Sequence, residues 1–315
     1  MSKQERLVFV NGRLVPESEA TISIFDVGRL YGATFYESIR TFRHRFFKLE
    51  EHLRRLEASL AYAGLAGMIG REQVVGAIQQ VFDANIGLTH EDDDLWVCAE
   101  VTPGTGFPMP LANSAPQAPT LIVYSSELPH EAYARHYTEG KHVVTARFRN
   151  VPPQSYEQRC KNRSRLPHFM AKLEAQKIDP DAFALLLDTD GLISEGTGAN
   201  IFFAAGGVLR TPTTRNVLSG ISRQTVIELA AREGIEVQER DLTLYDAYTA
   251  EEAFWTTTSY CILPISAVDG RPIGQSYPGP LAARLLTAWS QMVGVDIVGQ
   301  ARRFALDKSS CTAHG

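Results

Sequence analysis

The stretch that decides the fold is CKNRSRLPHF at residues 160–169, which contains Lys161, taken together with LDTDGLISEGTGANIFF at residues 187–203, which contains Glu195. A lysine amine can form a Schiff base with an aldehyde, and an acid can hold a ring nitrogen protonated. Chemistry with pyridoxal 5′-phosphate (PLP) needs both groups. Neither residue alone would indicate this cofactor, because most lysines are solvated and a Glu between glycines is often only a turn residue.

The composition of the chain suits a globular protein of two domains. Of its 315 residues, 44% are hydrophobic and 21% are charged, and the formal net charge is −5. No block of like charges suggests a polyanion-binding face, so we expect no nucleic-acid partner. The N-terminus lacks the apolar region of a signal peptide, and no stretch has the roughly 18 uninterrupted apolar residues of a membrane span. We therefore expect no membrane partner.

The four cysteines, Cys98, Cys160, Cys261 and Cys311, lie far apart and form no CxxC pair. This spacing argues against a zinc site or a redox dithiol, so we expect no metal. It fits a reducing compartment, and we expect the protein to be cytoplasmic.

Hydrophobic spacing predicts an α+β first domain over residues 1–130. Asn11-Gly12 between two short apolar runs predicts a hairpin with a type I′ turn. TFYESIRTF and FFKL, on either side of a basic turn, predict a second hairpin. The other predicted elements are helices over 50–64 and 72–85 and strands over 95–101 and 120–124. The Pro-rich segment 107–119 is predicted to be a loop near the active site.

The second domain is predicted over residues 131–300, followed by a tail at 301–315. Its predicted strands cover residues 142–148, 182–188, 200–204, 208–212 and 254–260. Its predicted helices cover residues 163–177, 222–233 and 279–293. The helix over 163–177 has Leu166, Phe169, Met170 and Leu173 on one face, and Lys161 is expected just before this helix.

Several segments follow the order of the fold-type IV PLP enzymes, the branched-chain and D-amino-acid aminotransferases. Residues 50–59, EEHLRRLEAS, resemble the family's H-x-x-R-L-x-x-S helix, which places Arg55 at the phosphate ligand. Lys161 lies where the family has its Schiff-base lysine, and Glu195 lies where the family has the acid beside the pyridine nitrogen.

Two further segments match the family's phosphate site. Ile221 and Ser222 in SGISR open a predicted helix, whose N–H groups and positive dipole end attract anions. Thr258 in FWTTTSY resembles the family's Gly-Thr-Ala strand end, which implies that its hydroxyl binds phosphate and that the N–H of Ser259 binds the substrate carboxylate.

The resemblance covers about residues 6–290 and implies the remaining properties. It implies an α+β / α/β fold of the D-amino-acid aminotransferase-like kind, with two domains and PLP at the domain interface. Lys161 would be the catalytic residue, which moves a proton between the substrate Cα and the cofactor. The family also implies a homodimer or higher homo-oligomer.

Residues 31–40, YGATFYESIR, resemble the YG-x-x-x-F-E-G-I-R strand of the branched-chain enzymes. Tyr31, Tyr36 and Arg40 are therefore expected to line the substrate pocket. Tyr36, Ser38 and Arg40 share one face of the strand, because side chains alternate with a period of two. Ser38 replaces the family's glycine and narrows the pocket. Arg40 could equally be a structural ion-pair partner.

Two departures keep the substrate open. Leu166 stands where branched-chain enzymes have a Tyr, and TPGTGFPMP lacks the Arg and His that D-amino-acid enzymes use for the carboxylate. Arg165-Leu166 with Ser38 resembles the aminodeoxychorismate lyases. ISIFD, RFFKLEEH and ARFRNVPPQSYEQRCKN are similar to the (R)-selective amine transaminases. A non-catalytic PLP-binding homologue is a further alternative, against which the intact Lys161 and Glu195 argue.

The sequence therefore predicts an aminotransferase for small or branched aliphatic amino acids, with 2-oxoglutarate or pyruvate as the amino acceptor. Basic residues cluster in the sequence around the lysine: Arg147, Arg149, Arg163 and Arg165. Some are expected to bind carboxylates of the substrate or the acceptor, because planar guanidinium groups suit bidentate binding. The alternative for several of them is an interface ion pair.

Overall fold

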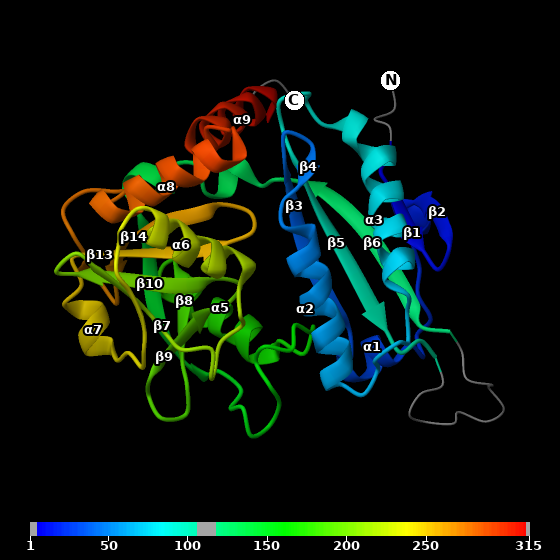
Figure 1. The fold of residues 1–315 in the computed structure, drawn as a ribbon, viewed down its shortest axis with the longest axis horizontal. Coiled ribbons are helices and arrows are strands. Elements are labelled where there is room, and N and C mark those ends of the chain that lie inside the picture. Colours follow the sequence, from blue (N-terminus) through cyan, green and yellow to red (C-terminus); the bar gives the residue numbers. More distant parts are fainter. Residues whose placement is uncertain (1–4, 106–117, 313–315) are drawn as a thin grey trace. The chain divides into compact units, whose positions relative to one another are not determined.

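The computed structural model describes residues 5–105 and 118–312, and the chain forms two compact units (Figure 1). The first unit runs up to Leu128 and also includes Cys160–Arg165, whereas the second consists of Pro129–Arg159 and the chain from Leu166 onward. The expected boundary lay between residues 130 and 131, with residues 160–165 in the second domain. The segment that contains Lys161 instead belongs to the first unit, because its backbone is bound there.

The sheet of the first unit is antiparallel and has the strand order β2-β1-β6-β5-β3-β4. Strands β1 (Leu7–Val10) and β2 (Arg13–Pro16) form the first predicted hairpin. Asn11 and Gly12 have φ values of 47° and 93°, as a type I′ turn requires. The second predicted hairpin is also confirmed, and the remaining strands of the sheet are β3 (Phe35–Phe42), β4 (Arg45–Phe46), β5 (Leu95–Thr102) and β6 (Thr120–Glu127).

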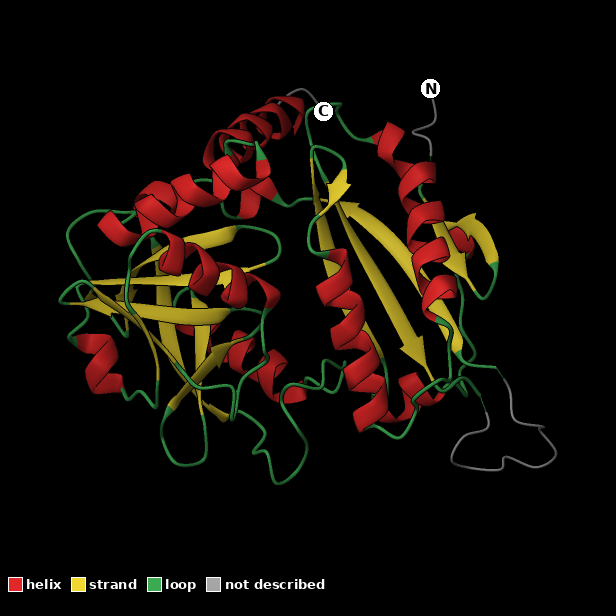
Figure 2. Ribbon diagram, in the orientation of Figure 1, coloured by secondary structure: helices red, strands yellow, loops and turns green. Residues whose placement is uncertain are grey.

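Helices α2 (Leu49–Tyr62) and α3 (Arg71–Asn85) cover one face of this sheet (Figure 2). Leu53 and Leu56 of α2 and Val81 of α3 pack in one core with Ile39 and Val97 of the sheet. Because strand side chains alternate, the opposite face carries a polar set. This set is Tyr36, Ser38, Cys98, Glu100 and Tyr124. Shorter helical segments are η1 (Glu17–Glu19), α1 (Val27–Tyr31) and η2 (Ile86–Leu88).

The sheet of the second unit is mixed, with the order β12-β11-β10-β13-β14-β7-β8-β9 and with β15 paired to β14. Strand β7 runs parallel to β8 and β14, and β11 runs parallel to β12. The strands are β7 (Lys141–Arg149), β8 (Phe183–Leu187), β9 (Ile193–Gly196), β10 (Asn200–Ala205), β11 (Val208–Thr211), β12 (Val237–Glu239), β13 (Glu252–Thr257), β14 (Cys261–Val268) and β15 (Arg271–Pro272). Strands β9, β12, β14 and β15 were not predicted.

The longer helices of the second unit are α5 (Leu166–Ile178), α6 (Ile221–Arg232), α8 (Pro280–Val293) and α9 (Ile297–Thr312), and the shorter ones are η3 (His130–Ala132), α4 (His136–Glu139) and α7 (Leu244–Tyr248). The prediction of an unstructured tail from residue 301 was wrong, because α9 extends through it. Helix α5 begins at Leu166 rather than 163, and Pro167 suits its first turn.

The apolar stripe of α5 faces away from the sheet of its own unit. Leu166, Phe169, Met170 and Leu173 are 69%, 57%, 37% and 40% exposed. The helix packs on β7 and β8 through small residues, Ala171 and Ala175, both fully buried. Small side chains allow close approach to the strands, so the larger residues of the stripe remain outside the core of this unit.

The predicted loop at 107–119 falls largely on residues 106–117, which lie outside the described part of the chain. In the described part, no helix combines the length and the apolar character needed to cross a membrane.

Candidate active site

The backbone of Lys161 is fixed by β3 and α2 of the first unit. The N–H of Tyr36 donates to the carbonyl of Lys161 at 3.2 Å, and the N–H of Arg163 donates to the carbonyl of Thr34 at 2.9 Å. The N–H of Lys161 itself donates to Oγ of Ser59 in α2, at 3.0 Å. Residues 160–165 thus extend the edge of the sheet, and the lysine side chain starts from a fixed position.

The amine of Lys161 lies among aromatic and charged groups. The residue is only partly exposed, and its Nζ lies 4.4 Å from the centroid of the Tyr36 ring. Burial lowers the pKa of Lys161, and the charge of Arg55 lowers it further, although Tyr36 acts in the opposite direction. A lowered pKa leaves a larger fraction of the amine neutral, and the neutral amine is the nucleophilic form.

Tyr36 is surrounded by three cationic side chains. Nη1 of Arg165 donates to its hydroxyl at 3.0 Å, and Cζ of Arg163 lies 3.6 Å from the ring centroid. Burial raises the pKa of Tyr36, but the charges of Lys161, Arg165 and Arg163 outweigh burial and lower the pKa to about 8. The phenol is therefore a proton donor or acceptor in the physiological range, next to the lysine amine.

Helix α2 presents three polar residues of the H-x-x-R-L-x-x-S pattern on one face, because they are three or four positions apart. Arg55 donates through Nε and Nη2 to the two carboxylate oxygens of Glu37, each at 2.7 Å. Nδ1 of His52 lies 2.7 Å from the same carboxylate, and Ser59 binds the backbone of Lys161. The sequence analysis quoted this pattern but assigned a role to Arg55 alone.

Glu37 is fully buried between these cations. Burial raises the pKa of Glu37, but Arg55 and His52 outweigh burial and lower it to about 2. The charged carboxylate fixes the direction of the Arg55 guanidinium. The role of Arg55 as a phosphate ligand stays a prediction.

The other predicted substrate residues differ in surroundings. Tyr31 ends α1 and is 55% exposed, and Ser38 pairs across the sheet with Cys98. Arg40 is buried, with Nη2 at 3.9 Å from Oδ2 of the buried Asp94, and its guanidinium stacks on Phe42. This contact favours the ion-pair alternative for Arg40.

In the second unit, Glu195 lies on β9 and is 7% exposed. Its Oε2 accepts a hydrogen bond from the N–H of Leu218 at 3.0 Å and lies 3.4 Å from Nδ2 of Asn200. The same Nδ2 donates to the carbonyl of Leu218 at 3.0 Å. Asn200 therefore fixes the local backbone, as predicted, and also contacts the acid.

This network continues to the N-terminus of α6, where Ile221 and Ser222 lie. Gly220 precedes the helix, and no side chain caps its first N–H groups. A Cβ on Gly220 would lie 2.0 Å from Oδ1 of Asn200, so only glycine fits between the helix and the amide. The uncapped helix start is suited to bind an anion, and it is tied to Glu195 through residues 200 and 218.

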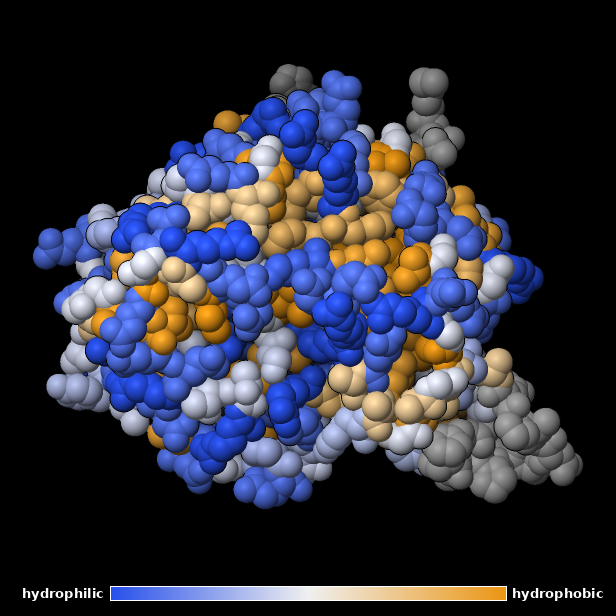
Figure 3. All heavy atoms as spheres, viewed as in Figure 1, coloured by the Kyte–Doolittle hydropathy of each residue, from blue (hydrophilic) through white to orange (hydrophobic). Residues whose placement is uncertain are grey.

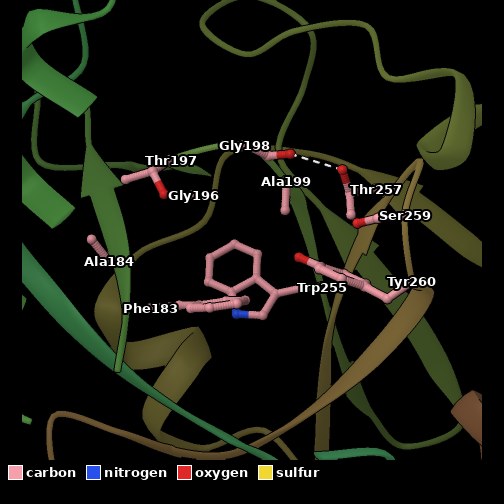
Figure 4. Close-up of a pocket in the computed structure, with 10 residues that line it drawn as sticks. All are labelled: Phe183, Ala184, Gly196, Thr197, Gly198, Ala199, Trp255, Thr257, Ser259 and Tyr260. Carbon is pink, nitrogen blue, oxygen red and sulfur yellow. Dashed lines mark hydrogen bonds between the residues drawn. The ribbon is translucent and has the colours of Figure 1, made fainter. Parts of the chain in front are cut away.

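A cavity of about 210 Å³ lies directly after Glu195 in the second unit (Figure 4). Thr197 and the neighbouring small residues line one side of it, and the aromatic side chains of Phe183, Trp255 and Tyr260 line the other. Thr257 donates through Oγ1 to the carbonyl of Gly198 at 2.9 Å. Of the predicted residues, Ser259 lines the cavity, while Thr258 lies in the turn after β13.

The four arginines have separate partners. Arg147 pairs with Glu174, Arg163 with Glu100, and Arg165 with the Tyr36 hydroxyl. Arg149 donates to the carbonyl of Ala146 at 3.5 Å. Among the residues that the structure describes, no cluster of three or more His, Cys, Asp or Glu side chains could hold a metal ion.

Comparison with known proteins identifies the family. The family model for amino-transferase class IV matches residues 34–268. A Methanocaldococcus jannaschii protein provisionally named a branched-chain-amino-acid aminotransferase is 33% identical over 279 residues, which cover 88% of this chain and 93% of that protein. The D-alanine aminotransferase of Bacillus licheniformis is 31% identical over 284 residues, which cover 89% of this chain and 95% of that protein.

A solved structure shows the same fold. A branched-chain amino acid aminotransferase whose source is given as T.th., complexed with N-(5′-phosphopyridoxyl)-L-glutamate, has a TM-score of 0.79 and 27% identity, and the match covers 94% of this chain and 95% of that one. The chain belongs to the class IV aminotransferases. It is a transaminase with the fold-type IV architecture, as the sequence predicted.

We expect Tyr36 to ionise near pH 8, because three cations stabilise its phenolate. An ultraviolet titration of the ligand-free protein at the tyrosinate band should show one ionisation with this midpoint. Tyr36→Phe should remove it. Arg165→Gln should raise the midpoint, since one cation and one hydrogen bond are lost. An unchanged titration in Tyr36→Phe would contradict the assignment.

We expect Glu37→Gln to destabilise the protein at neutral pH but less so in acid. The folded pKa of Glu37 is about 2, below its ordinary value of 4.5, so its stabilisation is complete above about 4.5 and is lost as the pH falls toward 2. Thermal midpoints at pH 7, 5, 3 and 2 should show the gap to the wild type closing below pH 4.5. The exposed Glu19→Gln is the control, and a gap independent of pH would refute the argument.

Proposed function

We propose that this transaminase binds PLP through Lys161 and transfers the amino group of a small or branched aliphatic amino acid to a 2-oxo acid such as 2-oxoglutarate or pyruvate. The observation that carries the proposal is the amine of Lys161, which is fixed at its backbone and has a lowered pKa next to Tyr36. A surface lysine would have neither property.

The residues present suit the cofactor. The start of α6 offers N–H groups that no side chain caps, which supports Ile221 and Ser222 as phosphate ligands, with Arg55 and Thr258 as further ones. Glu195 is a buried carboxylate, which supports a role in holding the ring nitrogen protonated. Bound there, PLP would supply the electron-withdrawing ring that stabilises negative charge at the substrate Cα. Lys161 would hold the cofactor and move the proton at Cα.

The substrate assignment draws on two observations. Tyr36 and Arg165 form a hydrogen-bonded pair, which is suited to bind a carboxylate and so favours amino acids over simple amines. The T.th. branched-chain enzyme was solved with a phosphopyridoxyl adduct of glutamate, which supports PLP as the cofactor and 2-oxoglutarate as an acceptor. Ser259 lines the cavity after Glu195, which supports its predicted contact with the substrate.

We expect borohydride treatment of the PLP-loaded protein to place the pyridoxyl label on Lys161, as peptide mapping would show. Addition of L-leucine should bleach the visible band of the loaded protein. Lys161→Ala should lose turnover by at least about 10²-fold, because proton transfer at Cα is lost. Lys172→Ala, a change of an exposed lysine on α5, is the matched control. A label on another lysine, or turnover retained in Lys161→Ala, would refute the proposal.

D-Amino acids are the second candidate donors. The D-alanine aminotransferase of Bacillus licheniformis aligns over most of both chains, and Leu166 replaces the tyrosine of the branched-chain enzymes. In the same absorbance assay, bleaching by D-alanine and not by L-leucine would favour this candidate.

We also propose that two copies of the chain associate through the exposed stripe of α5. Its four residues are large and apolar, and such stripes commonly mark interfaces. Figure 3 shows apolar patches among polar residues on the face in view. A cytoplasmic location is part of the proposal too, supported by the buried thiols of Cys98, Cys160 and Cys261.

We expect Phe169→Glu to shift the protein toward the monomer, because a carboxylate buried in an apolar interface is costly. Light scattering coupled to size-exclusion chromatography would measure the mass. Tyr245→Glu, which changes an exposed aromatic residue on α7, is the control. A monomeric wild type, or a Phe169→Glu dimer of unchanged stability, would contradict this interface.

A further inference from the structure

His168 is a buried imidazole whose ring nitrogens lack hydrogen bonds. It lies in the first turn of α5, and the residue is 5% exposed. Neither Nδ1 nor Nε2 has a hydrogen-bond partner among the described residues. Leaving a buried polar group unsatisfied costs about 1–3 kcal/mol, so native structures rarely do so without a reason.

The nearest charged partner of this imidazole is Glu195. Nε2 of His168 lies 3.6 Å from Oε1 of the carboxylate. This distance exceeds a hydrogen bond, so the interaction is electrostatic, and it acts between two buried groups where water screens little. The other oxygen, Oε2, is bound by Leu218 and Asn200. In the described part of the chain, His168 is thus the side chain that faces Oε1.

Charged groups on the elements around α5 are engaged with other partners. On β7, Lys141 binds Asp181 at 2.6 Å and His142 binds Asp179 at 2.8 Å. Arg147 of β7 binds Glu174 of α5 itself at 2.5 Å. After β8, Asp188 lies 3.2 Å from Arg215. None of these pairs includes His168 or Glu195, so the two residues form a separate pair.

We propose that His168 is a positioning residue: it directs Oε1 of Glu195 and stabilises the ionised carboxylate, so that a proton is retained on the ring nitrogen of bound PLP. The inference rests on the proposed function, since it requires the cofactor beside Glu195. Leu218 and Asn200 hold one oxygen by neutral donors. An N–H dipole or an imidazolium at the other oxygen favours the charged form of the acid. A carboxylate that stays charged in turn favours a protonated ring nitrogen.

The test follows the ring nitrogen directly. The protein is loaded with PLP that carries ¹⁵N in the ring, and the nitrogen chemical shift is recorded across a pH range in the wild type, His168→Leu and His168→Gln. We expect the pH at which the ring nitrogen loses its proton to fall by about one unit in His168→Leu, a tenfold change. Gln places an N–H near the position of Nε2, so His168→Gln should keep the wild-type midpoint.

His142→Leu is the matched control, because it also removes an imidazole beside a carboxylate in the same unit. It should leave the midpoint unchanged. His168→Met replaces His168→Leu if the latter does not fold, as judged by circular dichroism. Equal midpoints in the wild type and the apolar variant would overturn the inference and leave the proposed function standing, and so would equal shifts in the Gln and Leu variants. A wild type that takes up no PLP would overturn both.

Discussion

The fold depends on a short backbone pairing between β3 and the segment that contains Lys161. Hydrogen bonds from Tyr36 to Lys161 and from Arg163 to Thr34 close a bridge that joins residues more than a hundred positions apart. Ser59 adds a third bond from α2. Main-chain hydrogen bonds fix direction as well as distance, so the lysine amine can be placed against Tyr36 and near Arg55. A surface loop of the same sequence would leave this amine solvated, with its pKa in the ordinary range.

The second unit achieves the same precision with side chains. The amide of Asn200 contacts both the carboxylate of Glu195 and the carbonyl of Leu218, whose own N–H returns to that carboxylate. Residue 218 leads into the glycine before α6. The acid and the helix start are therefore coupled, and a change at either should be felt at the other. His168 completes the surroundings of the acid from α5.

Much of the fold could be predicted from local patterns, but the surroundings of the site could not. Periods of two and of 3.6 residues predicted both hairpins and the long helices α2, α3 and α6, because each pattern is contained within one element. The return of residues 160–165 to the first unit is a non-local pairing and has no local signal. Glu37 looked like any strand residue, and its role follows only from the helix face opposite. Leu166 and Phe169 predicted a helix face correctly but not its exposure, since small alanines make the contact with the sheet.

The same excursion limits how the gene could be divided. A chain ending at Leu128 would contain the whole antiparallel sheet and both covering helices, yet it would lack the six residues that complete its edge and carry the reactive amine. Those residues would remain on the other fragment, flanked on both sides by sequence belonging to the second unit. Neither half could therefore have arisen, or be expressed, as a self-contained enzyme, and an ancestral fusion of two independent modules is hard to reconcile with this path of the chain.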